Sequence, residues 1–259
     1  MPQPVAQRQV DDGTLQVKGE FDEVTLSTPT VSGLLVWLDA NDSRSYSGSG
    51  STWYDISGNH YDFTLYNSPA FTSGTASYLS FVRNSLQYGD RPGIGDLNSW
   101  TIEVWLKISE PLSLVEATAA ITTVYDVPGG AHPGVINYCL GTFNGGPSNA
   151  LTNGFFTGGL WINTSGFTPT IGDWYQVVGT YDGNDLVEYV NGAVLSAASY
   201  NWTAVSNGGG IRIARRWDGP LSAIHMFPGS ISIARIYERA LNAAEVAHNF
   251  AVDHSRFGI

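Results

Sequence analysis

Residues 173–195, which read DWYQVVGTYDGNDLVEYVNGAVL, decide the fold of this chain. Two apolar runs, 187–190 and 193–195, flank the dipeptide Asn191-Gly192. Asn-Gly tolerates the positive φ angles of a tight type I′ turn, so the dipeptide is a strong signal for a β-hairpin. A third β-rich run, 174–181, ends in the turn residues DGND. The stretch therefore predicts three successive antiparallel strands and, with them, an all-β sandwich.

The composition agrees with a large β-sandwich and disfavours two classes of partner. The chain has 259 residues, 30 glycines, 12% aromatic residues and only 14% charged residues, which suits many turns and strands in one domain. Its formal net charge is −11. Nucleic acids and anionic membranes both attract basic patches, and no apolar run approaches the ~18 residues that span a membrane. We therefore expect neither nucleic-acid binding nor membrane insertion.

Cys139 is the only cysteine, so the chain forms no internal disulfide. Its apolar neighbours predict a buried, inert thiol rather than a nucleophile. Residues 1–13 lack the apolar core of a signal peptide. We expect a protein that is made in the cytoplasm without a secretion signal.

Residues 1–32 differ from the rest of the chain and form a predicted N-terminal arm. They are rich in Gln, Asp, Thr and Ser, and residues 14–21 alternate polar and apolar as a half-buried strand does. The arm is too short to hold a core of its own. Two interpretations stay open: a disordered lead-in, or an anchor that pairs with a neighbouring subunit. Residues 33–259 form the predicted jelly-roll domain.

Regular alternation defines the strands of this domain. Trp100–Ile108 places five apolar side chains on one face, and Trp105 among the polar set predicts that the outer face is also partly covered. Asn242 and Glu245 form a capping-box pattern, which predicts one short C-terminal helix. The predicted strands are 34–38, 61–66, 78–82, 100–108, 119–125, 135–141, 155–162, 174–181, 187–190, 193–195, 210–215 and 229–237.

Three segments in this order carry a resemblance to a known family. They are WYDISGN at 53–59, the stretch 174–192, and FPGSISIARIY at 227–237 followed by RALN. The chain resembles the concanavalin A-like lectin/glucanase superfamily, specifically its laminin-G-like branch. The resemblance implies a two-sheet antiparallel jelly-roll sandwich. Ser232 departs from the pattern, because the family often has Asp there, and this weakens the transfer of any role tied to that acid.

The end of the chain carries a finer resemblance. Residues 245–258, EVAHNFAVDHSRFG, are similar to the ending of such domains in tailed-phage virion proteins. This resemblance implies a virion structural protein on the particle surface, as a capsid decoration or a fibre-like appendage. Its implied partners are other capsid or tail proteins, bound through the arm. A homo-oligomer is expected as well.

An enzyme is the first alternative, and the sequence gives it little support. Related glycoside hydrolases carry E-x-D-x-x-E on one strand, and this chain has no glutamate pair with that spacing. Glu103 and Glu188 are isolated in predicted strands, which favours a solvated outer face. There is no G-x-S-x-G motif, and the five histidines form no zinc-spacing pair. We expect no catalytic residues.

Calcium and carbohydrate are the remaining candidate ligands. Asp55, Asn59 and Asp62 are weak calcium candidates, since Asp and Asn in turns also bind their own backbone. Loop aromatics offer stacking surfaces for a sugar, whereas Trp37, Trp100 and Trp174 are expected in the core. The leading hypothesis is a non-enzymatic virion module, and the alternative is a lectin module that recognises host-surface glycans. The candidate ligand-binding residues are Tyr125, Trp161, Trp202 and Trp217.

Overall fold

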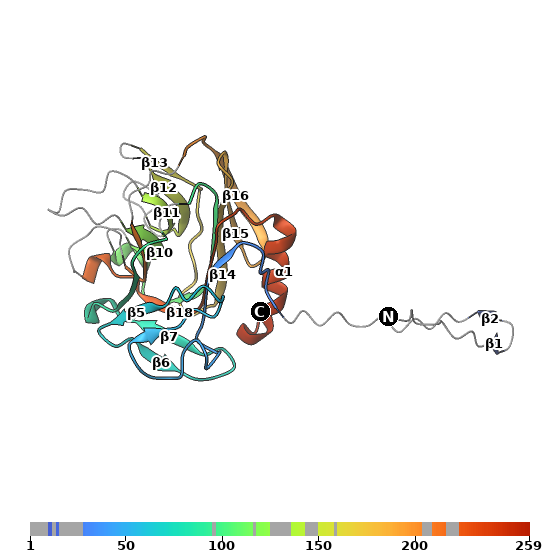
Figure 1. Cartoon of the computed structure of the whole chain (residues 1–259), viewed down its shortest axis with the longest axis horizontal. Helices are drawn as coiled ribbons and strands as arrows, with labels where there is room; N and C mark the ends of the chain where they lie inside the picture. The colour runs from blue at the N-terminus through green and yellow to red at the C-terminus, as the bar shows by residue number, and fades with distance from the viewer. Residues whose placement is uncertain are drawn as a thin grey trace.

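Two antiparallel β-sheets face each other in the structure, which is a computed structural model (Figure 1). It describes residues 10–11, 14–15, 28–94, 97–115, 118–124, 136–142, 150–157, 160–203, 209–215 and 223–259. The predicted all-β jelly roll with one short C-terminal helix is confirmed. The first sheet, called here the helix-covered sheet, has the strand order β16-β15-β14-β9-β18-β7-β6, with β3 also paired to β18. The second sheet has the order β13-β12-β11-β10-β17-β8-β5-β4.

The strands of the helix-covered sheet are β3 (Leu34–Asp39), β6 (Ala70–Thr72), β7 (Tyr78–Phe81), β9 (Trp100–Ile108), β14 (Tyr175–Tyr181), β15 (Asp185–Val190), β16 (Ala193–Ser199) and β18 (Gly229–Tyr237). Those of the second sheet are β4 (Thr52–Trp53), β5 (Phe63–Tyr66), β8 (Tyr88–Arg91), β10 (Ala119–Val124), β11 (Ile136–Gly141), β12 (Thr152–Phe156), β13 (Trp161–Asn163) and β17 (Gly210–Ile213). Short 3-10 turns lie at Arg83–Ser85, Leu112–Leu114, Ala223–His225 and His254–Phe257 (η4).

The predicted hairpin is present between β15 and β16. Asn191 and Gly192 both have positive φ, at 50° and 77°, as a type I′ turn requires. One predicted strand was wrong, because 155–162 divides into β12 and β13. These two strands pair antiparallel, with Phe156 opposite Trp161. Gly158-Gly159 in the sequence was the turn signal for this second hairpin.

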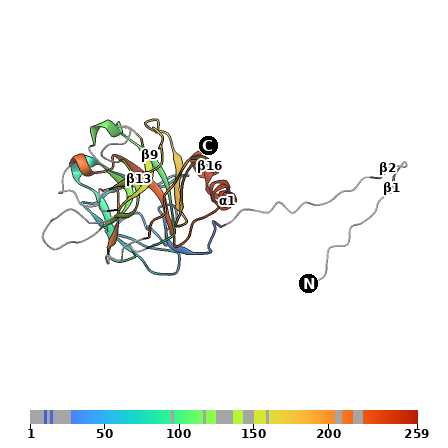
Figure 2. The same cartoon turned by 90° about the horizontal axis from the view of Figure 1, so that it is seen from above.

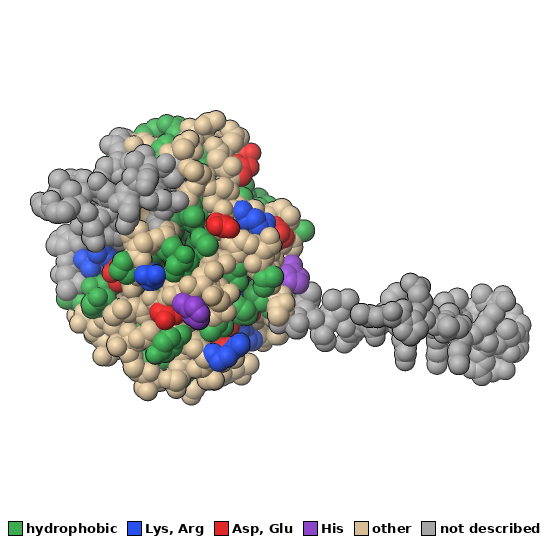
Figure 3. All heavy atoms as spheres, in the orientation of Figure 1, with side chains coloured by type: hydrophobic (Ala, Val, Ile, Leu, Met, Phe, Trp, Pro, Cys, Tyr) green, Lys and Arg blue, Asp and Glu red, His purple; other side chains and the backbone are tan. Residues whose placement is uncertain are grey.

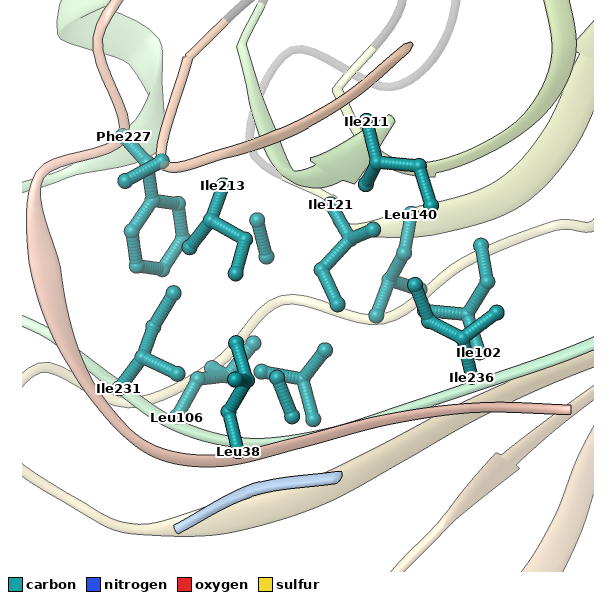
Figure 4. Close-up of a cluster of buried hydrophobic side chains, with 14 of the residues drawn as sticks. Leu38, Ile102, Leu106, Ile121, Leu140, Ile211, Ile213, Phe227, Ile231 and Ile236 are labelled. Carbon is teal, nitrogen blue, oxygen red and sulfur yellow. The ribbon is translucent and has the colours of Figure 1, made fainter. Parts of the chain in front are cut away.

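The core fills the space between the sheets (Figure 4). Leu38, Ile102, Leu106, Ile231 and Ile236 project from the helix-covered sheet toward Ile121, Leu140, Ile211, Ile213 and Phe227 on the other side. All of them are buried. Each such side chain stabilises the fold by roughly 1.5–3 kcal/mol through its removal from water. Trp100 is in this core as expected, but Trp37 and Trp174 are only partly buried, so that prediction was wrong for them.

Helix α1 (Ala243–Asp253) packs on the outer face of the helix-covered sheet (Figures 1 and 2). The predicted capping box is present, since Asn242 accepts from the backbone N–H of Glu245 and Glu245 accepts in return. Trp105 is fully buried beneath this cover, with its ring centroid 4.1 Å from that of Phe257. The prediction of a covered outer face at Trp105 is therefore confirmed.

The predicted solvated position of Glu103 was wrong, because the same cover buries its side chain fully. Arg235 on β18 lies 2.9 Å from Glu103 and 2.7 Å from Asp253 of α1. Asn249 donates a further hydrogen bond of 2.7 Å to Glu103. Burial opposes the charged guanidinium, yet the two carboxylates raise the pKa of Arg235 above its ordinary value. This network joins the helix to the sheet.

The arm falls largely outside the described residues. Val10–Asp11 (β1) and Thr14–Leu15 (β2) form an antiparallel pair of their own, and the rest of the predicted strand 14–21 is not described. On the face seen in Figure 3 the charged side chains are scattered and form no patch of one sign. Within the described parts of the chain, no helix is long and apolar enough to cross a membrane.

Candidate functional site

A stack of aromatic rings lies on the outer face of the second sheet. In β5 the side chains of Phe63 and Leu65 point into the core, so Thr64 and Tyr66 point outward. Tyr66 pairs with Tyr88 of β8, and their rings lie parallel with centroids 4.6 Å apart and an interplanar angle of 7°. We call Tyr66, Tyr88 and the neighbouring Arg215 the tyrosine stack.

Arg215 closes one end of this stack and leaves the other end open. Its Cζ atom lies 4.8 Å from the ring centroid of Tyr88. Because Tyr66 already covers one face of Tyr88, the guanidinium lies over the other face. Tyr66 itself is 42% exposed, so the second face of its ring is accessible. The arrangement is an aromatic surface in which Tyr88 and Arg215 support the exposed ring of Tyr66.

Polar side chains lie beside the tyrosine stack on the same face. Asp90 pairs with Thr64 on one side and with Arg212 on the other, and Arg212 donates from Nε to Asp90 at 3.2 Å. Burial lowers the pKa of Arg215, and the nearby charge of Arg212 lowers it further. A sugar has an apolar ring face and a rim of hydroxyls, so an aromatic platform bordered by Asp, Arg and Thr suits both parts.

Of the sequence-predicted aromatic residues, the structure describes Trp161 and Trp202, and it places these two on opposite faces of the second sheet. Trp161 is half-buried on the outer face of the second sheet, 4.9 Å from the ring centroid of Phe156. Trp202 packs on the inner side, where it stacks on Phe155 at 4.7 Å. Its backbone also exchanges two hydrogen bonds with the hydroxyl of Tyr181, so its contacts are those of a structural residue. Tyr125 and Trp217 lie outside the described residues.

The calcium candidates form a loop in which most of their oxygens already accept hydrogen bonds. Asp55 accepts from the backbone N–H groups of Trp37, Ser57 and Tyr61, and Asp62 accepts from the backbone of Asp55. Asn59 donates from its side chain to the backbone. In the described ranges, no three His, Cys, Asp or Glu side chains form a group that could hold a metal ion. The loop has a structural explanation, and calcium binding stays a prediction.

Glu188 is fully buried inside the sandwich, so its predicted place on a solvated face was wrong. Thr164 donates a 2.5 Å hydrogen bond to its Oε2 atom. Burial raises the pKa of Glu188 to about 7, against the opposing hydrogen bond of Thr164. The atoms Glu188 Oε1, Asn153 Oδ1 and Ser196 Oγ have no hydrogen-bond partner in the part of the chain that the structure describes. No cation lies among the causes of this pKa shift.

Sequence reasoning missed the tyrosine stack. The alternation in 63–66 was a usable signal, because it places Tyr66 on the face opposite Phe63 and Leu65. The pairing with Tyr88 depends on the register of β5 against β8, 22 residues later in the chain. No local pattern encodes that register.

Comparison with known families now places the chain. The profile of Laminin_G_3, described as the concanavalin A-like lectin/glucanases superfamily, matches residues 73–247. The chain belongs to this family. The Laminin_G_3 match contains the second and third of the three segments noted in the sequence. It also contains β8, which carries Tyr88, whereas β5, which carries Tyr66, precedes the match. A sequence search of curated proteins finds no match.

Solved structures with the same fold include sugar-binding and sugar-cleaving proteins. Domain 4 of AbnA, a GH43 extracellular arabinanase from Geobacillus stearothermophilus, was solved with arabinotriose and has a TM-score of 0.61 at 16% identity. The match covers 83% of this chain and 97% of that domain. Trypanosoma rangeli sialidase has a TM-score of 0.59 at 16% identity, with 88% of this chain covered but only 34% of the sialidase. The botulinum neurotoxin type G receptor binding domain has a TM-score of 0.58 at 14% identity, covering 85% of this chain and 51% of that one. At these identities the likeness shows the fold alone.

Proposed function

We propose that this chain is a non-enzymatic carbohydrate-binding jelly-roll module whose sugar rests on the free face of Tyr66. The tyrosine stack carries the proposal, because an exposed ring that is packed against a second ring loses little conformational freedom when a sugar binds to its open face. Domain 4 of AbnA supports it, as a module of the same fold and nearly the same extent that was solved with arabinotriose.

The chemistry of the carboxylates supports binding rather than cleavage. A glycoside hydrolase needs two carboxyl groups about 5–10 Å apart across the scissile bond. Glu103 is fully buried and paired with Arg235, and Glu188 is fully buried in the core. Beside the tyrosine stack, Asp90 is in an ion pair with Arg212. Held in this ion pair, the carboxylate can accept a hydrogen bond from a sugar hydroxyl and so orient a bound sugar.

A glycan array probed with and without calcium tests this function. We expect binding by the wild type and by Tyr66→Phe, which keeps the aromatic ring. Tyr66→Ala should weaken binding at least about tenfold, equivalent to roughly 1.4 kcal/mol. The matched control is Tyr54→Ala, because Tyr54 is 49% exposed but lies outside the stack. If no glycan binds in either condition, or if Tyr66→Ala binds as the wild type does, the proposal is wrong.

We also propose that the module belongs to a tailed-phage virion, as a capsid decoration or a fibre-like appendage made in the host cytoplasm and displayed on the particle surface. The resemblance of 245–258 to phage virion proteins supports this context. The attachment of the arm supports an anchoring role. The backbone N–H of Thr30 donates to Asn249 at 2.8 Å, and the Thr28 carbonyl lies 3.0 Å from Nε2 of His248. Residues 1–27 therefore precede a point that is fixed on helix α1.

Deletion of residues 1–27 tests the anchor and spares the contacts of Thr28 and Thr30. We expect the shortened chain to fold and to keep its glycan binding, but to be lost from purified particles. Tyr66→Ala is the reciprocal control, and it should enter particles normally. Incorporation of the shortened chain at the wild-type level would show that capsid or tail proteins do not hold this protein by its arm.

A further inference from the structure

The strands at the edges of the two sheets differ in length. Among the described residues, the edge strands β4, β6 and β13 have two, three and three residues, whereas the edge strand β16 has seven. An edge strand presents unpaired N–H and C=O groups, and short edges limit pairing with another chain. β3 has six residues and also pairs on one side only, with β18. Its other side is occupied, because Trp37 donates to Asp55 and accepts from Ile56, and the Leu35 carbonyl accepts from the side chains at 57 and 59. Among the described strands, β16 is therefore the long edge that can offer a row of free backbone groups.

β16 also lacks the residues that normally block edge pairing. Its sequence is AVLSAAS, without a charge or a proline, although the whole chain carries a net charge of −11. Val194 is 58% exposed and Leu195 is 44% exposed. A β-bulge displaces Leu195 near the hairpin turn, because Glu188 pairs with Ser196 and Tyr189 with Val194. The register of β15 with β16 is regular from Ser196 to the end of the strand.

We propose that β16 pairs with β16 of a second copy of this chain. Two identical strands can pair antiparallel about a twofold axis, so one surface is enough for both partners. Charge favours a second copy here, since two acidic chains repel each other wherever their carboxylates meet, and this edge has none. The pairing joins the helix-covered sheets of the two copies into one continuous sheet. It also brings the exposed Val194 and Leu195 side chains of both copies out of water.

Helix α1 leaves this edge accessible. In Figure 1 it lies against the outer face of the sheet, with β16 at the margin. It contacts β16, and at the turn a Cβ built on Gly192 would lie 3.0 Å from Phe250. Among the described residues, no backbone hydrogen bond joins α1 to β16, so the backbone groups on the outward edge of β16 stay free of the helix.

Sedimentation velocity of the full chain over a range of concentrations tests the pairing. We expect a wild-type dimer, and a dissociation constant at least about tenfold higher for Val194→Lys and for Ala197→Lys, since each adds a positive charge to the same edge of both copies and edge lysines oppose strand pairing. Val31→Lys is the matched control, because Val31 is 66% exposed but precedes β3, away from the edge. Thermal unfolding checks that each variant is folded. A wild-type monomer at all concentrations, or a dimer unaffected by both lysines, overturns the proposal.

Cysteine cross-linking identifies the occupant of the edge. The native Cys139 is buried, so Ala197→Cys would introduce the one accessible thiol among the described residues. With twofold β16 pairing, a short bismaleimide should link two copies of this variant, whereas Val31→Cys should stay unlinked. If the arm of a neighbouring copy occupied the edge instead, the lysine variants would dissociate but Ala197→Cys would not cross-link. That outcome also overturns the proposal.

Discussion

Replacement of Glu188 by Gln tests how the burial of this carboxyl group changes the pH dependence of stability. Burial raises the pKa of Glu188 from the ordinary value of 4.5 to about 7. The folded state therefore holds its proton more tightly than the unfolded state does. Between these two pH values the folded chain binds one more proton, so the free energy of unfolding falls as the pH rises from about 4.5 to about 7, and then levels off.

The size of the effect follows from the same two values. At about 1.4 kcal/mol for each pH unit, the difference corresponds to about 3 kcal/mol of stability that the wild type loses across this window. Gln has a similar shape and no charge, so Glu188→Gln should not lose it. The free energy of unfolding of Glu188→Gln, measured relative to the wild type, should therefore rise by about 3 kcal/mol between pH 4.5 and pH 8.

Urea unfolding at pH 4.5, 5.5, 6.5 and 8 measures this difference and cancels the contributions of groups common to both proteins. Glu238→Gln is the control, because Glu238 is exposed and its replacement should give a constant difference. A constant difference for Glu188→Gln as well would refute the reasoning. It would mean that Glu188 is either exposed to water or paired with a cation in the folded protein.

The other predictions concern single contacts. Arg235→Met leaves Glu103 buried without its cation, so the free energy of unfolding in urea should fall by about 3–5 kcal/mol. The control Arg44→Ala removes an exposed ion pair and should leave the unfolding midpoint unchanged. Asn242→Ala removes the side-chain cap of α1 and should lower the free energy of unfolding by about 1 kcal/mol in the same assay. Cys139 should resist a thiol reagent in the native protein and react on unfolding, because burial raises its pKa to about 12.

The fold was predictable because its strongest signals are local. The Asn191-Gly192 turn, the alternation in Trp100–Ile108 and the capping box at Asn242 each depend on residues close together in the chain. Glu103 and Glu188 show where such reasoning stops. Alternation assigns a side chain to one face of a strand, but whether that face is solvated depends on what packs against it. Arg235, which neutralises Glu103, is 132 residues away in sequence.

The candidate site was less predictable for the same reason. The sequence points to aromatic residues in loops, such as Trp202, whereas the tyrosine stack lies on strands and depends on the pairing of Tyr66 with Tyr88. Trp202 instead packs on Phe155 in the core. An aromatic residue becomes a platform only when its neighbours hold it and leave one face open. Both conditions are set by register and packing.

The covered and uncovered surfaces together restrict where a ligand and a second copy can bind. Helix α1 and η4 bury Trp105 and thereby occupy the outer face of the helix-covered sheet. A sugar that stacks on a strand therefore has the outer face of the second sheet available. Tyr66 lies on β5, near the end of that sheet marked by β4, whereas β12, near its other end, packs against β15 beside β16. The tyrosine stack and the β16 edge are thus at opposite ends of the sandwich. A dimer formed through β16 keeps both stacks free, and two weak sugar sites in one dimer would then bind a glycan-coated surface more tightly than either site alone.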